Sequence, residues 1–293
     1  MAIASELSSL ERRVTAIERH LGLAAVPAAP PPALRRMVVG VNVDAQSTQI
    51  EDVISSNAKF ARFPVWADAL PTPEASLRIY SEYAARLASQ HIEPLIVCDS
   101  RSWANDNYPL WATMPVHYVQ MGNEWDILSE SSFTQTAAQF SADLRWAREW
   151  FDTHRPDGTP RRYLIAGGAA SGHEWLLHDV DLSPVDAIAV HPYGQRADGY
   201  PRSDYGHGEL RDLIRRYKQF HKPIWITENG WRDDEVDQET QAELLSRTME
   251  IAEEEGVVAY LPYTLVLASS DQFDLDPGIV LETFRREARL RSQ

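Results

Sequence analysis

The stretch YVQMGNEWDI, which spans residues 118–127, begins like a buried strand and ends in a cluster of polar side chains. Its first half, YVQM, is largely apolar, and a glycine then precedes Asn123, Glu124 and Trp125. Polar residues at the end of an apolar strand are typical of a sheet whose carboxyl-terminal edge carries a binding site. The stretch therefore predicts a parallel sheet with its function at that edge.

A second stretch, PIWITENGW at residues 223–231, repeats this pattern. An apolar run leads to Glu228, and an asparagine, a glycine and Trp231 follow. Two carboxylates, Glu124 and Glu228, thus stand at the ends of two predicted strands that are far apart in the chain.

Short apolar runs alternate with helix-length segments from residue 37 onward. Eight runs are predicted strands, at residues 37–43, 60–65, 94–99, 117–122, 163–168, 186–192, 223–228 and 257–266. The main predicted helices are residues 73–90, 134–151, 208–221 and 238–255. Alternating strands and helices predict a parallel sheet covered by helices, and eight such units match a (β/α)8 TIM barrel. An open doubly wound sheet is the alternative, but the first strand leads into GVNVDAQS, which is not a glycine-rich phosphate turn.

The charge, composition and cysteine count argue against several classes of function. The 293 residues are 44% apolar and carry a formal net charge of −15, so we expect neither nucleic acid nor a membrane as a partner. No apolar run approaches the roughly 20 residues of a spanning helix, and the N-terminus lacks the apolar core of a signal peptide. We therefore expect a soluble protein and assign no compartment. A single cysteine, Cys98, permits neither an intrachain disulfide nor a cysteine-based metal site.

The first 35 residues divide into two segments of different composition. In residues 1–23 apolar residues recur at coiled-coil spacing, and the seam consists of Ile3, Leu7, Leu10, Val14, Ile17 and Leu21. Isoleucine at d positions favours trimers or tetramers, so we expect a homo-oligomer. The alternative is an amphipathic helix that caps the bottom of the main domain. Prolines make residues 24–35 a semi-rigid linker, which leaves residues 36–293 as the barrel.

The two carboxylates indicate a reaction once they are placed on the barrel. Active sites of TIM barrels lie at the carboxyl ends of the strands. Glu124 and Glu228 follow the fourth and seventh strands, so we expect them to face each other across the mouth. A carboxyl pair about 5–5.5 Å apart performs retaining glycoside hydrolysis, in which one acid protonates the leaving oxygen and the other attacks the anomeric carbon.

The motifs GNEW and TENGW resemble those of glycoside hydrolase clan A, the retaining glycosidases on (β/α)8 barrels. The resemblance covers roughly residues 37–290, and it implies that Glu124 is the acid/base and Glu228 the nucleophile. It also implies that Arg62 ends the second strand beside the site, and that His191 in AVHPYG belongs to the sixth. Clan members usually carry a tryptophan after strand eight, whereas this chain has YLPYTLV there.

A wider set of residues is expected around the substrate. Asn123 is expected to supply an amide to the sugar 2-hydroxyl. The complete set of substrate-binding candidates is Asn123, Arg62, His191, Tyr193, Trp231, Trp125, Tyr263, Trp103 and His173. No metal-ligand spacing is recognisable among the histidines, so we expect neither a metal nor another cofactor.

Several of these residues have an ordinary structural alternative. Glu124 could be a helix N-terminal carboxylate that interacts favourably with the helix dipole. Arg62 could pair with a structural acid, Asp44 or Asp99, and His191 could be a satisfied histidine near the core. Each loop tryptophan could pack a helix instead of lining a sugar cleft.

The sequence therefore predicts a retaining glycoside hydrolase that cleaves β-glycosidic bonds of an oligo- or polysaccharide. The alternative is a carbohydrate-binding or structural component of a larger phage or cell-surface assembly that keeps a glycosidase-like barrel. Transglycosylation by the same residues remains open, as do the sugar, the linkage and the choice between endo and exo cleavage.

Overall fold

The computed structural model describes the main part of the chain from Arg36 onward. The described residues are 36–46, 48–65, 72–98, 114, 116–126, 135–154, 160–169, 173–193, 209–232, 236–265, 275 and 278–292. The predicted coiled coil, the proline linker and Trp103 lie outside these residues, as does Asp99.

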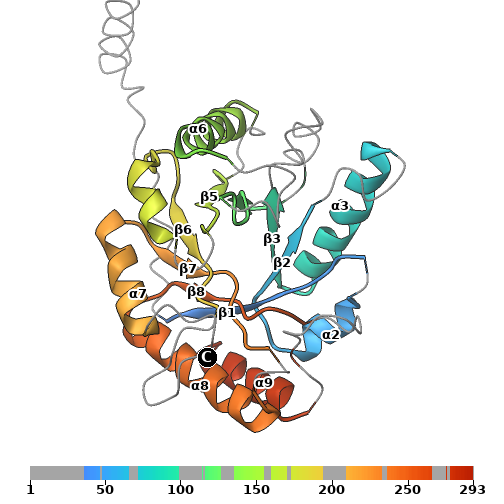
Figure 1. Ribbon diagram of the computed structural model, residues 1–293. Coiled ribbons are helices and arrows are strands. Elements are labelled where there is room, and N and C mark those ends of the chain that lie inside the picture. Colours follow the sequence, from blue (N-terminus) through green and yellow to red (C-terminus); the bar gives the residue numbers. More distant parts are fainter. Residues whose placement is uncertain are drawn as a thin grey trace, which may run out of the picture. The chain divides into compact units, whose positions relative to one another are not determined.

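Eight parallel strands close into a barrel in sequence order (Figure 1). The strands are β1 (Val38–Asn42), β2 (Phe60–Pro64), β3 (Glu93–Cys98), β4 (Tyr118–Met121), β5 (Tyr163–Ala166), β6 (Ala187–Val190), β7 (Ile224–Ile226) and β8 (Ala259–Tyr260). β1 pairs in parallel with β8, which closes the sheet. Each strand lies inside or within one residue of its predicted run, so the predicted barrel is confirmed and the open sheet is excluded.

Helices surround the barrel on its outside (Figure 1). They are α2 (Ile50–Ser55), α3 (Pro73–Ser89), α6 (Ala137–Thr153), the 3-10 helix η1 (Glu174–Asp179), α7 (Leu210–Tyr217), the 3-10 helix η2 (Lys218–Phe220), α8 (Gln238–Glu254) and α9 (Ile279–Arg291). All four predicted helices are present as α3, α6, α7 with η2, and α8. None of the described helices is long and apolar enough to cross a membrane.

Side-chain caps explain where the long helices begin. Thr72 accepts a hydrogen bond from a backbone N–H of the first turn of α3, which also has Pro73 at a position where proline is favoured. At α6, Thr136 and Gln139 form a capping box, and Asp237 caps α8. These caps satisfy N–H groups that have no partner inside the helix.

The core has two layers, one inside the barrel and one between the strands and the helices. Trp225 of β7 fills the interior layer, with its ring centroid 5.2 Å from that of Phe60, 5.6 Å from Tyr118 and 5.9 Å from Tyr163. Such aromatic contacts stabilise beyond the area they bury. The interior of the barrel is therefore packed with side chains, and the described strands enclose no open channel.

Candidate active site

A tight turn after β4 carries the residues Asn123 and Glu124. Gly122 has φ 76°, and its N–H donates to the Cys98 carbonyl at 2.7 Å, which extends the sheet by one bond. Glu124 itself lies in the left-handed region, at φ 40°, which is uncommon for a residue with a side chain. The chain thus leaves the strand by a tight turn, and this turn brings the Glu124 carboxylate to the mouth.

Two glycines, Gly122 and Gly167, allow the turn to lie close to α6 and to the end of β5. A Cβ at Gly122 would lie 2.8 Å from the Phe140 ring of α6. A Cβ at Gly167, after β5, would lie 2.0 Å from the Gly122 carbonyl oxygen. Side chains at these positions would push the end of β4 out of place.

Glu228 follows β7 and is 6% exposed. Its Oε1 lies 2.7 Å from Arg62 Nη1 at the mouth end of β2. The Tyr193 hydroxyl donates to its Oε2 at 2.8 Å. Arg62 therefore forms an ion pair with this carboxylate at the mouth.

The ionisation of Glu228 is set by opposing effects. Burial raises the pKa of Glu228, but His191, Arg62 and the Tyr193 hydroxyl lower it by more, so the net direction is down from 4.5. The pKa of Tyr193 is raised well above 10, first by burial and then by the charge of Glu228. At neutral pH a carboxylate accepts a hydrogen bond from a neutral phenol.

His191 connects the two carboxylates. It is 1% exposed, and its Nδ1 lies 3.1 Å from Glu124 Oε1 and 3.7 Å from Glu228 Oε2. Its Nε2 lies 3.0 Å from Thr227 Oγ1. His191 is thus buried, as expected for a histidine near the core. It also contacts both carboxylates.

One oxygen of Glu124, one oxygen of Glu228 and a ring nitrogen of His191 all lie within 4.8 Å of one another. Three such donors could in principle hold a metal ion. The Arg62 guanidinium, 2.7 Å from Glu228, opposes a second cation at this point.

Arg62 is held by three further side chains. Its Nη1 donates to Asn42 Oδ1 at 2.5 Å, its Nε to Gln120 Oε1 at 3.0 Å, and its Nη2 to Asn123 Oδ1 at 2.6 Å. Asn42 is one of the polar residues expected at the strand ends, whereas Gln120 and Thr227 were not predicted to belong to the site. Gln120 could have been found from the sequence, because it is a polar residue inside the otherwise apolar strand YVQM.

The two predicted binding tryptophans that follow the motif carboxylates, Trp125 and Trp231, are both buried. Trp125 is 1% exposed and stacks on Phe140 with ring centroids 4.6 Å apart. It therefore packs against the helix α6, which was the alternative to lining a sugar cleft. Trp231 is 7% exposed, and its carbonyl accepts a hydrogen bond from Gln241 Nε2 at 3.1 Å. Neither indole presents an open face to the mouth.

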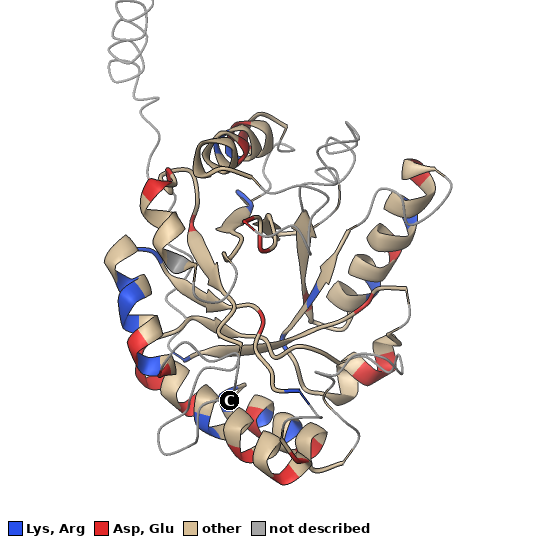
Figure 2. Cartoon of the chain, in the orientation of Figure 1, with Lys and Arg blue, Asp and Glu red and all other residues tan. Residues whose placement is uncertain are grey.

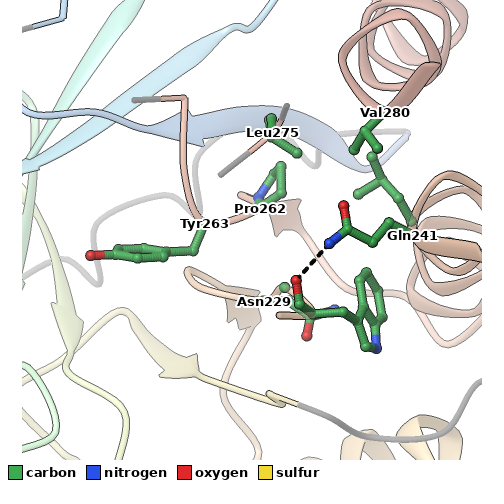
Figure 3. Close-up of a pocket in the computed structure, with 9 residues that line it drawn as sticks. Asn229, Gln241, Pro262, Tyr263, Leu275 and Val280 are labelled. Carbon is green, nitrogen blue, oxygen red and sulfur yellow. Dashed lines mark hydrogen bonds between the residues drawn. The ribbon is translucent and has the colours of Figure 1, made fainter. Parts of the chain in front are cut away.

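Tyr263 follows β8, where clan members usually carry the tryptophan. It borders a small pocket between the strand ends and α8, but its ring extends away from Gln241 and Val280 (Figure 3). The ring meets Tyr193 edge-on, with centroids 6.1 Å apart. Because Tyr193 contacts Glu228, Tyr263 is the described aromatic side chain that continues from the carboxylates along this wall.

His173 follows β5 and contacts a residue of the turn after β4. Its Nδ1 is 2.6 Å from Asp126 Oδ2, and its side chain is 47% exposed. Asp126 is two residues beyond Glu124, so this pair ties the loop after β5 to the loop after β4.

Comparison with known families gives one sequence match. The family model described as glycosyl hydrolase catalytic core matches residues 110–274, which is more than half of the chain. This span includes both Glu124 and Glu228. No curated protein matches the sequence.

Solved structures with the same fold include several enzymes that act on polysaccharides. The endo-1,4-β-D-mannanase of Thermotoga petrophila RKU-1 has 12% identity and a TM-score of 0.61, over 87% of this chain and 99% of that one. The endo-1,4-β-mannanase of Rhizomucor miehei has 11% identity and a TM-score of 0.63, over 88% and 95%. A GH128 endo-β-1,3-glucanase of Amycolatopsis mediterranei has 15% identity and a TM-score of 0.55, over 86% and 99%. At such identities the likeness shows the fold alone.

Proposed function

Because the chain belongs to the glycosyl hydrolase catalytic core family and is a glycoside hydrolase, we propose that it cleaves β-glycosidic bonds with retention of configuration. Its substrate is an oligo- or polysaccharide. Glu228 is the nucleophile and Glu124 the acid/base.

The separation of the carboxylates carries the proposal. Oxygens of Glu124 and Glu228 lie within 4.8 Å of each other. Retaining enzymes hold their carboxyl groups about 5–5.5 Å apart, whereas inverting enzymes need about 6.5–9.5 Å to admit a water. Oxygens this close together favour the shorter separation of retaining enzymes over the longer one of inverting enzymes.

Glu228 is suited to the nucleophilic step because its carboxylate is held ionised. In the first step a Glu228 oxygen bonds to the anomeric carbon while the bond to the leaving oxygen breaks. Glu124 transfers its proton to that oxygen. The product is a covalent glycosyl ester, and the Arg62 guanidinium no longer faces a full negative charge.

Glu124 then acts as the base in the second step. It takes a proton from a water molecule, whose oxygen bonds to the anomeric carbon as the ester bond to Glu228 breaks. His191, 3.1 Å from Glu124 Oε1, fixes the carboxyl group in place through both halves of the cycle. A sugar hydroxyl in place of that water would give transglycosylation.

The neighbouring residues supply the sugar contacts. Asn123 Oδ1 is occupied by Arg62, which leaves the amide N–H groups to donate to the 2-hydroxyl, a contact that strengthens in the transition state. Tyr263 provides an aromatic wall, and His173 lies at the outer end of the site. Trp125 and Trp231 support the mouth from behind.

Hydrolysis of a panel of aryl β-glycosides and β-linked polysaccharides tests the proposal. The wild type is expected to release sugar, and Glu228→Ala is expected to release none. Glu124→Ala is expected to lose activity on natural substrates but to keep the first step on aryl glycosides whose leaving group needs no proton. Glu250→Ala, at an exposed position on α8, is the matched control. Full activity in Glu228→Ala would refute the assignment.

A further inference from the structure

We propose that Gln120 and Asn42 are positioning residues that hold the Arg62 guanidinium with neutral acceptors, so that its whole positive charge serves Glu228. We call these two amides and Arg62 the guanidinium cradle. The link of this cradle to catalysis rests on the proposed function, whereas its hydrogen bonds do not depend on that function.

Each nitrogen of the Arg62 guanidinium donates a hydrogen bond, two of them within the cradle and the third to Asn123. Nε donates to Gln120, Nη1 to Asn42 and Nη2 to Asn123, while Nη1 also lies 2.7 Å from Glu228 Oε1. Arg62 is 3% exposed. A planar guanidinium held on all its edges cannot turn, so its distance to the nucleophile is fixed.

Gln120 can present only its oxygen to Arg62. Its Nε2 donates to the Gly122 carbonyl at 3.0 Å, so its Oε1 must face the guanidinium. It is completely buried inside the barrel. Its strand, β4, ends in the turn that carries Glu124, so the same amide connects Arg62 to that turn.

Asn42 is oriented in the same way from β1. Its Nδ2 lies 2.8 Å from the Thr227 carbonyl, 3.3 Å from that of Leu261 and 3.1 Å from that of Pro262. These carbonyls belong to the ends of β7 and β8, so its Oδ1 is left for Arg62. Asn42 thereby joins the guanidinium to the strand that bears the nucleophile.

The neutrality of both acceptors has an electrostatic consequence. A carboxylate at either position would share the positive charge of Arg62, whereas an amide orients the cation without neutralising it. Among the described residues, the titratable groups that face Glu228 are Arg62 from β2, Glu124 from the turn after β4, and His191 and Tyr193 from the end of β6. Arg62 is the only one with a permanent positive charge.

The test introduces a charge at Gln120 without changing its size. Gln120→Glu places a carboxylate against Arg62 Nε, and we expect the Glu228 ionisation to move to higher pH by about one unit or more. Gln120→Met keeps the volume and removes the acceptor without adding charge. We expect it to lower kcat/KM while the Glu228 titration moves less than in Gln120→Glu. Asn42→Asp repeats the charge test from β1.

The main readout does not depend on hydrolysis. Carboxyl carbons of glutamate are labelled with 13C, the Glu228 signal is identified by its absence in Glu228→Gln, and its titration is followed by NMR in each variant with circular dichroism as the folding check. A folded Gln120→Glu with an unmoved Glu228 titration would overturn the cradle, as would an equal shift in Gln120→Met. A shifted titration in a protein that hydrolyses no glycoside would instead leave the cradle standing and refute the proposed function.

Discussion

The two carboxylates of the mouth receive different partners, and this difference separates their roles. Glu228 faces a guanidinium and a phenol, which both favour its ionised form. Glu124 instead has a ring nitrogen of His191 as a neighbour, 3.1 Å from its Oε1. A carboxylate held in its ionised form suits a nucleophile, and Glu124, beside which the described residues place no cationic guanidinium, is left for the acid/base role.

Removing the hydroxyl of Tyr193 tests how the nucleophile is kept ionised. Tyr193→Phe deletes one hydrogen bond of 2.8 Å to Glu228. Hydrogen bonds to charged groups contribute about 1.5–3 kcal/mol, so we expect kcat/KM to fall about 10- to 100-fold. Because this bond lowers the pKa of Glu228, the acid limb of the pH profile of kcat/KM should move to higher pH. An unchanged acid limb would contradict the role given to Tyr193.

At the scale of the element, the end of β4 depends on a glycine. Gly122→Ala combines a positive φ with a contact of 2.8 Å to the Phe140 ring. Gly256 has a similar φ of 74° but open space around it, so Gly256→Ala is a matched control. We expect the control to cost about 1 kcal/mol of unfolding free energy and to leave kcat/KM unchanged.

The Gly122→Ala variant should differ from that control in both respects. We expect a loss of unfolding free energy larger by about 1–3 kcal/mol, together with reduced kcat/KM, because the displaced turn carries Glu124. Thermal unfolding and steady-state kinetics measure the two effects. Equal behaviour of the two alanine variants would show that the Phe140 contact does not position the turn.

The neighbouring helices α7 and α8 are joined by a charge cluster around Glu255. Figure 2 shows basic residues of α7 beside acidic residues of α8. Glu255 lies 2.6 Å from Lys218, 2.9 Å from Arg215 and 3.1 Å from Arg211. The Lys218 hydrogen bond is the largest cause lowering the pKa of Glu255 from 4.5 to about 2; burial acts in the opposite direction, and both arginines add to the decrease.

This cluster predicts a pH-dependent loss of stability in Glu255→Gln. A lowered pKa means that the carboxylate stabilises the fold above pH 4.5 and loses that contribution as the pH falls toward 2. We expect the variant to be less stable by about 1 kcal/mol at pH 7, and the difference to shrink between pH 4.5 and 2. Denaturant unfolding across this range measures it, and a difference independent of pH would count against the ion cluster.

At the scale of the whole molecule, the barrel could be predicted because each strand carries its own signal. Strands buried on both faces read as continuous apolar runs, and all eight runs became strands. The resemblance to glycoside hydrolases, stated from short motifs, is confirmed by the family match. The carboxylates could be placed because the ends of parallel strands gather at one edge.

The side-chain environment could not be predicted in the same way. Trp125 directly follows Glu124 in sequence, yet its ring stacks on Phe140 of α6. Gln120 precedes Glu124 on β4, but its side chain contacts Arg62, which belongs to β2. Such contacts depend on the register between strands, and a single sequence does not contain that information.

The N-terminal heptads predict an assembly that does not contribute to catalysis. We propose that residues 1–23 self-associate as trimers or tetramers. Leu10→Glu with Ile17→Glu places charges on the apolar seam, and we expect the full chain to become monomeric with unchanged kcat/KM. Ser8→Glu, outside the seam, is the control. Light scattering after gel filtration measures the mass, and a wild-type monomer would refute the association.

The most direct test of the account is to trap the glycosyl-enzyme. The enzyme is treated with an activated 2-deoxy-2-fluoro glycoside of the sugar found by the substrate panel, because fluorine at this position slows hydrolysis of the ester. Mass spectrometry of the digested protein is expected to find the sugar on the peptide that contains Glu228, and no label in Glu228→Gln. A label on another residue, or substrate turnover that yields the inverted anomer, would contradict a double displacement at Glu228.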